Sequence, residues 1–276
     1  MIFRTEVPIP KPGFSIRPNE RMLFVGSCFA DNIGRRFADN HFPVMVNPFG
    51  VMYNPASVLH TVERLDAEYV PGVAFLTLGT NHVYILKETG EIVDNCRKRP
   101  QRLFVERELT IDECAEYLER AVGILLGRNP DIHIVLTVSP IRYAKYGYHE
   151  SQLSKSVLLL AADRLVREYD CVTYFPAYEI VNDELRDYRF YNSDMLHPSD
   201  QTVEYIWERL SAVYFSDDTR RFVEDWRPIR EALGHRPFNP DSQEYKSFLQ
   251  KTEARVREFE CKWRGNQPPK AALQGG

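Results

Sequence analysis

Ser27 and Cys28, two residues that can act as nucleophiles, stand side by side in the stretch FVGSCFADNIG. The apolar run MLFV precedes them and ends at Gly26, and the residues that follow have the pattern of a helix start. At the N-terminus of a helix, the dipole and the free backbone N–H groups favour the anionic form of a nucleophile. We therefore interpret this stretch as a catalytic strand-to-helix turn in which Cys28 or Ser27 attacks. Ser27 is also suited to a purely structural role, because serine is a favoured helix N-cap.

A candidate general base lies in the stretch DMLHP, residues 194–198. Asp194 precedes His197 by three residues, so both can lie in one loop within hydrogen-bond reach of each other. A histidine base requires such a carboxylate to orient its imidazole. Pro198 suits the first position of the helix that follows, so we expect His197 at the mouth of that helix. The structural alternative makes Asp194 a turn residue and His197 a helix cap.

Three further residues are candidates for holding the substrate. Gly50 can offer a backbone N–H group and Asn81 a side-chain amide, which are the donors that an oxyanion hole requires. Asn81 can instead support a turn, and Gly50 can also supply a positive φ. Arg142 can bind an anionic group of the substrate or equally form a surface ion pair. The seven histidines show no metal-ligand spacing, so we expect neither a metal nor a cofactor.

The hydrophobic pattern indicates the elements that must position these residues. Short apolar or β-branched runs alternate with longer helical patterns, which is typical of a parallel sheet covered by helices on both faces. In such a sheet, ligands bind at the carboxyl ends of the strands, which is where the candidate residues lie. The expected strands are Met22–Val25, Val44–Val46, Ala74–Leu78, Ile132–Val138 and Cys171–Phe175.

Helical patterns lie between these strands. One begins near Phe29, and another runs from Thr110 to Leu126 and opens with TIDE, a capping-box arrangement. A third covers residues 151–168, where the face expected to be buried holds Leu153, Val157, Leu160 and Leu165. The segment His82–Asp94 interrupts the alternation and predicts a β-hairpin inserted after the third strand.

The composition is that of a globular protein with an added segment. The 276 residues, of which 43% are hydrophobic and 27% charged, suit one large α/β domain with an extension. We expect residues 1–216 to form the α/β domain and residues 217–263, which are charged and free of strand patterns, to form a helical C-terminal extension packed on it. Residues 264–276 have the composition of a disordered tail.

Charge and apolar patterning exclude several functional classes. The net charge of −4 argues against binding to nucleic acid, and no apolar run reaches the roughly 20 residues of a membrane helix. The N-terminus lacks the apolar core of a signal peptide. Five scattered cysteines without a CxxC pair favour free thiols in a reducing compartment. We therefore expect a cytoplasmic protein without a membrane partner, and the oligomeric state remains open.

The order of these motifs resembles a known superfamily. Gly26-Ser27-Cys28, Gly50, Gly79–Asn81 and Asp194–His197 are similar, in this order, to the four sequence blocks of the SGNH/GDSL hydrolases. More narrowly, the chain resembles the bacterial GSCFA-domain family. The motifs that carry this resemblance are GSCFA, NPFGVMYNP, VSPIR, DELRDYRFY and HRPFNP, and they span nearly the whole chain.

The resemblance implies a flavodoxin-like, three-layer α/β/α fold with a five-stranded parallel sheet, and hydrolysis of an ester or acyl group. Two positions depart from the superfamily pattern. The usual nucleophilic serine lies two residues after the first glycine, where this sequence has Cys28. The acidic residue that usually follows the asparagine of the third block is replaced by His82.

Two functional hypotheses from different classes follow. The first is an SGNH-like acyl hydrolase or acyltransferase that acts on an ester or thioester of a small molecule or glycan, by a nucleophile–His–Asp mechanism. The alternative is a catalytically degenerate SGNH-like module that binds a glycan or an acylated metabolite. A thiol-redox role for Cys28 ranks last, because no resolving cysteine stands beside it.

Overall fold

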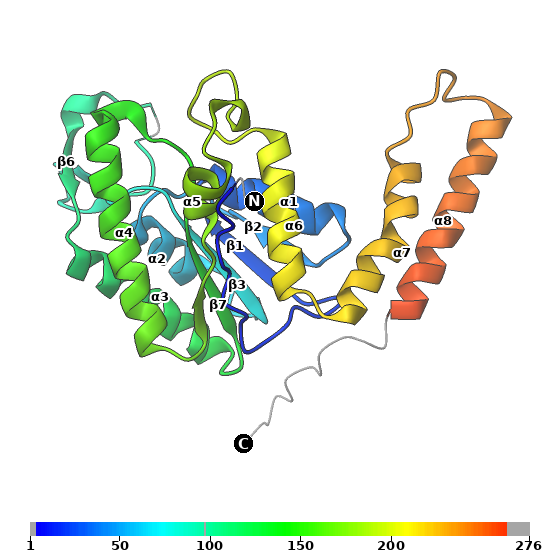
Figure 1. Ribbon diagram of the computed structural model, residues 1–276, viewed down its shortest axis with the longest axis horizontal. Helices are drawn as coiled ribbons and strands as arrows, with labels where there is room; N and C mark the ends of the chain where they lie inside the picture. The colour runs from blue at the N-terminus through cyan, green and yellow to red at the C-terminus, as the bar shows by residue number, and fades with distance from the viewer. Residues whose placement is uncertain (1–3, 97, 264–276) are drawn as a thin grey trace.

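The computed structural model describes residues 4–96 and 98–263, so the segment expected to be a disordered tail lies outside the described residues. A five-stranded parallel sheet forms its centre, with the strand order β2-β1-β3-β7-β8 (Figure 1). All five expected strands are present and the α/β fold class is confirmed. The strands are β1 (Met22–Gly26), β2 (Val44–Val46), β3 (Val73–Leu78), β7 (His133–Val138) and β8 (Val172–Tyr174).

Helices cover both faces of this sheet, and the alternation of side chains along each strand divides the core in two. Leu23 and Val25 of β1 pack with one set of helices, whereas Met22 and Phe24 face the other. The first set is α2 (Pro55–Arg64), α3 (Ile111–Arg128) and α4 (Tyr148–Glu168). The second includes α1 (Cys28–Asp39) and α6 (Asp200–Tyr214). Figure 1 shows the resulting three layers.

The helix starts follow local sequence signals. Thr110 caps α3 with the expected capping box, in which its hydroxyl accepts from the N–H of Glu113 and the Glu113 carboxylate accepts from the N–H of Thr110. Short helical segments complete the loops. They are η1 (Gln101–Leu103), η2 (Ala144–Tyr146), α5 (Ala177–Glu179), η3 (Ile180–Leu185) and η4 (Tyr188–Phe190).

The prediction of which face of the third helical segment is buried is wrong in part. Leu165 of α4 is buried as expected, but Leu153 and Leu160 are exposed. The helix also buries Ser154, Lys155, Leu158, Ala161 and Ala162. The reason is local: Ser154 and Lys155 hydrogen bond to the loops at the ends of β3 and β7, which turns this face of the helix toward the sheet.

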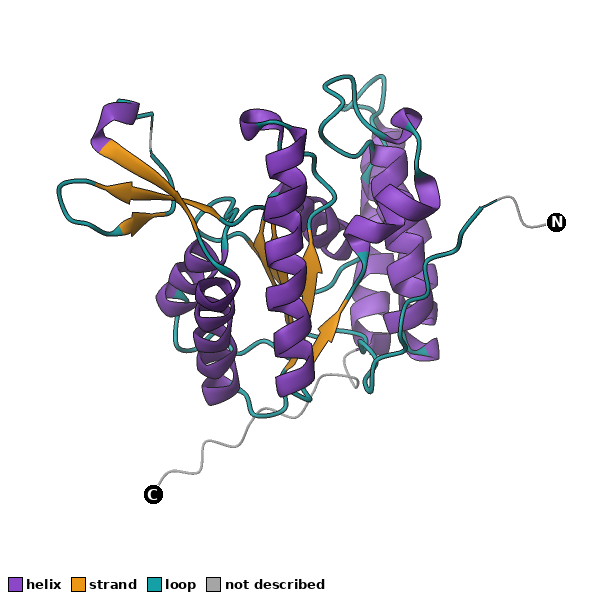
Figure 2. Ribbon diagram, turned by 60° about the vertical axis from the view of Figure 1, so that its left-hand side comes forward, coloured by secondary structure: helices purple, strands orange, loops and turns teal. Residues whose placement is uncertain are grey.

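A second, antiparallel sheet follows β3 and extends from the main body (Figure 2). It contains the expected hairpin, as β4 (His82–Leu86) and β5 (Ile92–Val93), and a third strand, β6 (Phe104–Glu108), that the sequence pattern did not indicate. The strand order is β5-β4-β6. The sequence pattern also did not indicate α2.

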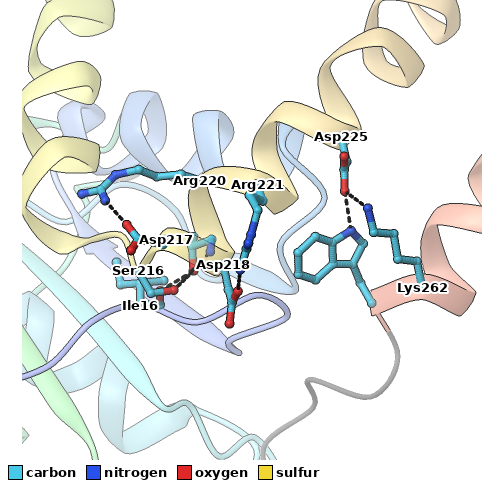
Figure 3. A network of polar contacts seen from close by, with 10 residues as sticks. Ile16, Ser216, Asp217, Asp218, Arg220, Arg221, Asp225 and Lys262 are labelled. Carbon is cyan, nitrogen blue, oxygen red and sulfur yellow. Dashed lines mark hydrogen bonds and ion pairs between the residues drawn. The ribbon is translucent and has the colours of Figure 1, made fainter.

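Two long helices follow the α/β part of the chain, α7 (Asp217–Leu233) and α8 (Gln243–Trp263). Trp226 of α7 donates its indole N–H to the carbonyl of Asp39 at the end of α1, at 2.8 Å, and stacks on His41. Asp225 then joins the two helices, because it accepts from Lys262 and from the indole of Trp263 (Figure 3). The boundary that we expect after residue 216 stays a prediction.

The first turn of α7 is also joined to the N-terminal segment (Figure 3). Ser216 caps the helix by accepting from the N–H of Thr219, and the hydroxyl of Thr219 donates to the carbonyl of Ile16 at 2.6 Å. The start of α7 is therefore fixed to the N-terminal segment by a bond from a side-chain hydroxyl to a main-chain carbonyl.

Gly26 ends β1 in a conformation that requires glycine. Its φ is +145°, and a Cβ atom placed on it would lie 2.1 Å from the carbonyl oxygen of Thr77 on β3. Gly26→Ala is therefore expected to lower the free energy of unfolding by about 3 kcal/mol. Gly90→Ala is the matched control, because Gly90 also has a positive φ but nothing within 4 Å of its Cβ position, and about 1 kcal/mol is expected. Equal losses in urea unfolding would contradict the close approach of β1 and β3.

Candidate active site

The turn that joins β1 to α1 gives its two candidate nucleophiles different surroundings. Ser27 is buried and is the N-cap of α1, with its hydroxyl accepting from the N–H of Phe29 at 3.3 Å. Cys28 is the first residue of α1 and is half-buried. Ser27 is buried and its hydroxyl serves the helix cap, whereas Cys28 is more accessible, so this geometry favours Cys28 as the reactive neighbour.

Some groups around Cys28 raise the pKa of its thiol and others lower it. Burial raises the pKa of the Cys28 thiol, and the carboxylate of Asp31 raises it further. The backbone N–H groups of Cys28 and Phe29 lower this pKa, as does the ammonium group of Lys155. Burial raises the pKa of the Tyr53 phenol. The negative charges of Cys28 and Asp31 nearby raise it further.

Asn47 fixes the conformation of this turn, and the sequence analysis did not single it out. Its side-chain oxygen accepts from the N–H of Gly26 at 2.8 Å, and its side-chain nitrogen donates to the carboxylate of Asp31 at 2.7 Å. Asn47 therefore joins the end of β1 to the first turn of α1. The available sequence signal was its place after the second strand, in the NPFG turn.

Asp194 and His197 form a hydrogen-bonded pair in the loop before α6. Asp194 Oδ2 lies 2.6 Å from His197 Nδ1, and Asp194 Oδ1 accepts from the backbone N–H groups of Leu196 and His197. These backbone bonds, followed by the imidazole, lower the pKa of Asp194 to about 2. The carboxylate is therefore ionised at neutral pH and can orient the imidazole, which leaves Nε2 for a proton transfer.

Pro198 is not the first residue of the following helix, which corrects the expectation from the sequence. α6 begins at Asp200, and Ser199 is its N-cap, with a hydroxyl that accepts from the N–H of Thr202. Pro198 instead forms an isolated bridge with Tyr191. His197 thus belongs to the loop and lies before the helix cap.

Arg142 holds the loop that carries Asp194 and His197. Its backbone N–H donates to the carbonyl of Leu196 and its guanidinium to the carbonyl of Met195, both at 3.0 Å. The same guanidinium lies 4.4 Å from the ring centre of Tyr148. The chain after β7 therefore positions the Asp–His pair at the carboxyl edge of the sheet, the edge at which α1 begins.

Gly50 and Asn81 each already donate a hydrogen bond within the protein. The N–H of Gly50, whose φ is +98°, donates to the carbonyl of Asn47 at 2.9 Å. Asn81 is buried, and its side-chain nitrogen donates to the carbonyl of Leu109 at 2.8 Å. Both residues therefore shape loops beside the candidate nucleophile, and these bonds favour a structural role for them over oxyanion binding.

Lys155 of α4 is a second residue at this edge that the sequence analysis missed. Its ammonium is buried and donates to the carbonyls of Gly79 and Ser139 at 2.6 and 2.8 Å. Burial lowers the pKa of Lys155 to about 7. The pattern of the helix gave no sign of this lysine, because apolar spacing directs attention to the leucines.

Comparison with known families identifies the chain. A family model described as the GSCFA family matches residues 21–72 and 71–210, and a second, described as the C-terminal domain of GSCFA domain proteins, matches residues 226–265. The chain belongs to the GSCFA family. In this GSCFA protein, the signature residues Gly26–Ala30 are the end of β1 and the first turn of α1.

Several solved structures are similar to this GSCFA protein, all at low sequence identity. A Streptococcus pneumonia protein, provisionally described as a platelet activating factor, is 18% identical with a TM-score of 0.50, over 72% of this chain and 85% of that one. A Parabacteroides merdae protein, provisionally described as a GDSL-like lipase, is 12% identical with a TM-score of 0.49, over 74% and 100%. A Clostridium thermocellum family two carbohydrate esterase, solved with cellohexaose, is 14% identical with a TM-score of 0.45, over 75% and 65%.

These likenesses concern the fold alone and leave the activity of this chain to be proposed. No curated protein gives a significant match to the sequence. In the described part of the chain, no helix is long and apolar enough to cross a membrane. The same residues contain no cluster of three histidine, cysteine or acidic side chains that could hold a metal ion.

A cavity of about 480 Å³ lies between the N-terminal residues 7–13 and β8, and none of the candidate residues lines it. The candidate site lies elsewhere, at the carboxyl edge of the sheet, where the loops after β1, β2, β3 and β7 meet.

Proposed function

We propose that this GSCFA protein is an acyl hydrolase or acyltransferase that acts on an ester or thioester, with Cys28 as the nucleophile. The observation that carries the proposal is the 2.6 Å bond between Asp194 and His197, in a loop tied by Arg142 to the end of β7. An oriented imidazole at the strand edge where a helix presents a thiol is the constellation that nucleophilic acyl transfer requires.

The proposed reaction has two stages. Cys28 Sγ attacks the acyl carbonyl and gives its proton to His197 Nε2, while Asp194 holds the proton on Nδ1. The tetrahedral intermediate then collapses, the proton on Nε2 passes to the leaving alcohol or thiol, and the acyl group stays on Cys28 as a thioester. In the second stage, water or an acceptor alcohol loses its proton to His197 and attacks the thioester, which returns the thiol to Cys28.

The developing oxyanion requires donors close to Cys28. The backbone N–H of Cys28 belongs to the first turn of α1, where N–H groups have no partner within the helix and the dipole favours negative charge. We assign the oxyanion to this end of α1. Gly50 and Asn81 are less suited to bind the oxyanion, because each already donates a hydrogen bond to a carbonyl within the protein.

A panel of short-chain p-nitrophenyl esters and acyl thioesters tests the proposed activity. The wild-type protein is expected to release the leaving group from at least one substrate with repeated turnover. Adding a primary alcohol, if the protein is an acyltransferase, should divert the acyl group to an ester product without slowing release of the first leaving group. The absence of turnover and of stoichiometric release with every substrate would contradict the proposal.

A second candidate function is a binding module for a glycan or an acylated metabolite. It is favoured by one observation: within residues 4–96 and 98–263, neither Cys28 nor Ser27 hydrogen bonds to His197. Against it, catalytic hydrogen bonds are often long in free enzymes and shorten on substrate binding. This candidate predicts that ligand binding survives Cys28→Ala and that no acyl group becomes attached to the protein.

A further inference from the structure

Arg142 is a cation at the candidate site whose guanidinium forms no ion pair with a carboxylate of the described residues. Its guanidinium donates to the carbonyl of Met195 at 3.0 Å. The other side-chain N–H groups of Arg142 make no hydrogen bond to a residue that the structure describes. Because a guanidinium presents several N–H donors in a planar fork, most of this fork is available to a ligand.

Three tyrosine rings surround this guanidinium. Its central carbon lies 4.4 Å from the ring centre of Tyr148, 5.5 Å from that of Tyr188 and 5.6 Å from that of Tyr191. Tyr148 begins α4, whereas the other two tyrosines come from η4 and the residue after it, so segments distant in the sequence converge on Arg142. Aromatic rings attract a cation, but unlike a carboxylate they leave its net charge in place.

Two of these rings are open to solvent. Tyr148 is 52% exposed and Tyr188 is 65% exposed. A ring of this kind offers a large apolar face together with a polar hydroxyl, and such exposed aromatic surface beside a charged group is suited to contact with a ligand. The surroundings of Arg142 therefore combine an uncompensated positive charge with apolar surface that a small molecule can cover.

The acidic groups of the neighbouring loop already have partners. The carboxylate of Asp194 accepts two backbone N–H groups of its own loop and binds the imidazole of His197. Asp187 forms an ion pair with Arg189 at 2.9 Å. Neither carboxylate pairs with Arg142, so its charge is available to an anion from outside the chain.

Arg142 also lies beside the candidate base. Met195, whose carbonyl accepts from the guanidinium, precedes His197 by two residues, so the Cα atoms of these two residues are at most about 8 Å apart. The segment after η4 is tied to the same loop, because the N–H of Asn192 donates to the carbonyl of His197 at 2.8 Å. A small substrate can therefore contact the guanidinium and the imidazole together.

We propose that Arg142, with the rings of Tyr148 and Tyr188, forms a carboxylate-binding subsite, so that the substrate is an ester or thioester that carries a carboxylate group. The planar fork of arginine matches a carboxylate through two parallel hydrogen bonds. A phosphate carries more charge and is less suited, because Lys145 and Arg189 of the same loops are already paired with acids. The reaction of this substrate rests on the proposed function, whereas binding of the carboxylate does not.

NMR titration of the wild-type protein with succinamate tests the subsite without any turnover. Succinamide is the matched ligand, because a neutral amide replaces the carboxylate. Succinamate should shift the side-chain Nε–H signal of Arg142 and the backbone amide signals of Leu196 and His197 with one midpoint, and succinamide should leave them in place. Equal shifts with both ligands, or no shift with succinamate, would overturn the proposal. Tighter binding of methyl phosphate than of succinamate would overturn the choice of a carboxylate.

Kinetics with matched esters separates ligand binding by Arg142 from its support of the loop. The esters are 4-acetoxybenzoate and the neutral 4-acetoxybenzamide. Arg142→Gln removes the charge but keeps an N–H donor for the carbonyl of Met195. It should lower kcat/KM about tenfold for the anionic ester, mainly through KM, and change that of the neutral ester by less than about twofold. An equal fall for both esters would show loop support alone and overturn the proposal.

Arg189→Gln is the matched control, because Arg189 is an exposed arginine of the same region that is paired with Asp187. It should leave the preference for the anionic ester unchanged, and an equal loss of preference in both glutamine variants would overturn the subsite. The titration of the wild-type protein decides the case in which Arg142→Gln does not fold. If succinamate binds as expected while no ester is hydrolysed, only the proposed function fails. If esters are hydrolysed without a preference for the anionic one, only the subsite fails.

Discussion

Replacing Cys28 by alanine is expected to lower kcat/KM for acyl hydrolysis by about 10⁴-fold or more, because no other group in the proposed mechanism can form the covalent intermediate. Residual activity would come from substrate binding and from the N–H groups at the start of α1. The measurement is kcat/KM with the best ester of the panel. Circular dichroism and urea unfolding of the variant should stay close to those of the wild type, since Cys28 is half-buried and its thiol meets the backbone N–H groups of Cys28 and Phe29, which the variant keeps.

Ser27→Ala is the matched control for Cys28→Ala. It removes the hydroxyl that caps α1 and should cost about 1 kcal/mol of stability, with a fall in kcat/KM of less than about tenfold. The two variants therefore separate the neighbouring residues by their effects on different quantities. If Ser27→Ala abolished turnover and Cys28→Ala retained it, the assignment of the nucleophile would be wrong.

Replacing His197 by alanine is expected to lower kcat/KM by about 10³-fold, which is typical for loss of a general base. Asp194→Asn should have an effect of similar order, because an amide no longer favours the imidazole tautomer that leaves Nε2 free. The comparison requires the pH profile of kcat/KM for both variants and the wild type. Activity that is independent of both substitutions would exclude the pair from the reaction.

The pH profile follows from the sign of the Asp194 shift. The hydrogen bonds of Asp194 hold its pKa at about 2, so the folded protein favours the ionised carboxylate. The stabilisation of the folded protein from this shift is complete at neutral pH. It decreases once the pH falls below about 4, the usual carboxyl pKa, and is lost as the pH falls through about 2. Any acid limb of kcat/KM near neutral pH therefore comes from a group other than Asp194. An acid limb of the wild type that Asp194→Asn removes and whose midpoint lies at about 4, the usual value of a free carboxyl, would contradict the lowered pKa of Asp194.

The central sheet could be predicted from the sequence because its three inner strands, β1, β3 and β7, are nearly continuous apolar runs that are buried on both faces. The edge strands β2 and β8 are only partly buried, but their β-branched residues still mark them as strands. The strand β6 could not, since it is a short strand, FVERE, with charged and exposed side chains. The helix α2 was missed because it has only ten residues and begins at Pro55, the last residue of the NPFGVMYNP motif. Burial of Lys155 in place of Leu153 depends on two strand-end carbonyls, which apolar periodicity does not register.

The same limit applies to the candidate site. The Asp194–His197 interaction is local in sequence, so their spacing was enough to place them in one loop. Asn47 and Lys155 act through groups that lie far away along the chain, and only the assembled sheet brings these partners to them. Gly50 and Asn81 show the converse, because a donor that looks available in the sequence can be occupied within the fold.

Detection of the acyl-enzyme tests the central claim most directly. The protein is mixed with p-nitrophenyl acetate, quenched in acid during turnover, digested and analysed by fragment-ion mass spectrometry. The account predicts one acetyl group on Cys28, bound as a thioester that neutral hydroxylamine removes, and none in Cys28→Ala. An acetyl group on Ser27, or turnover of the ester without an acetyl group on Cys28, would contradict it.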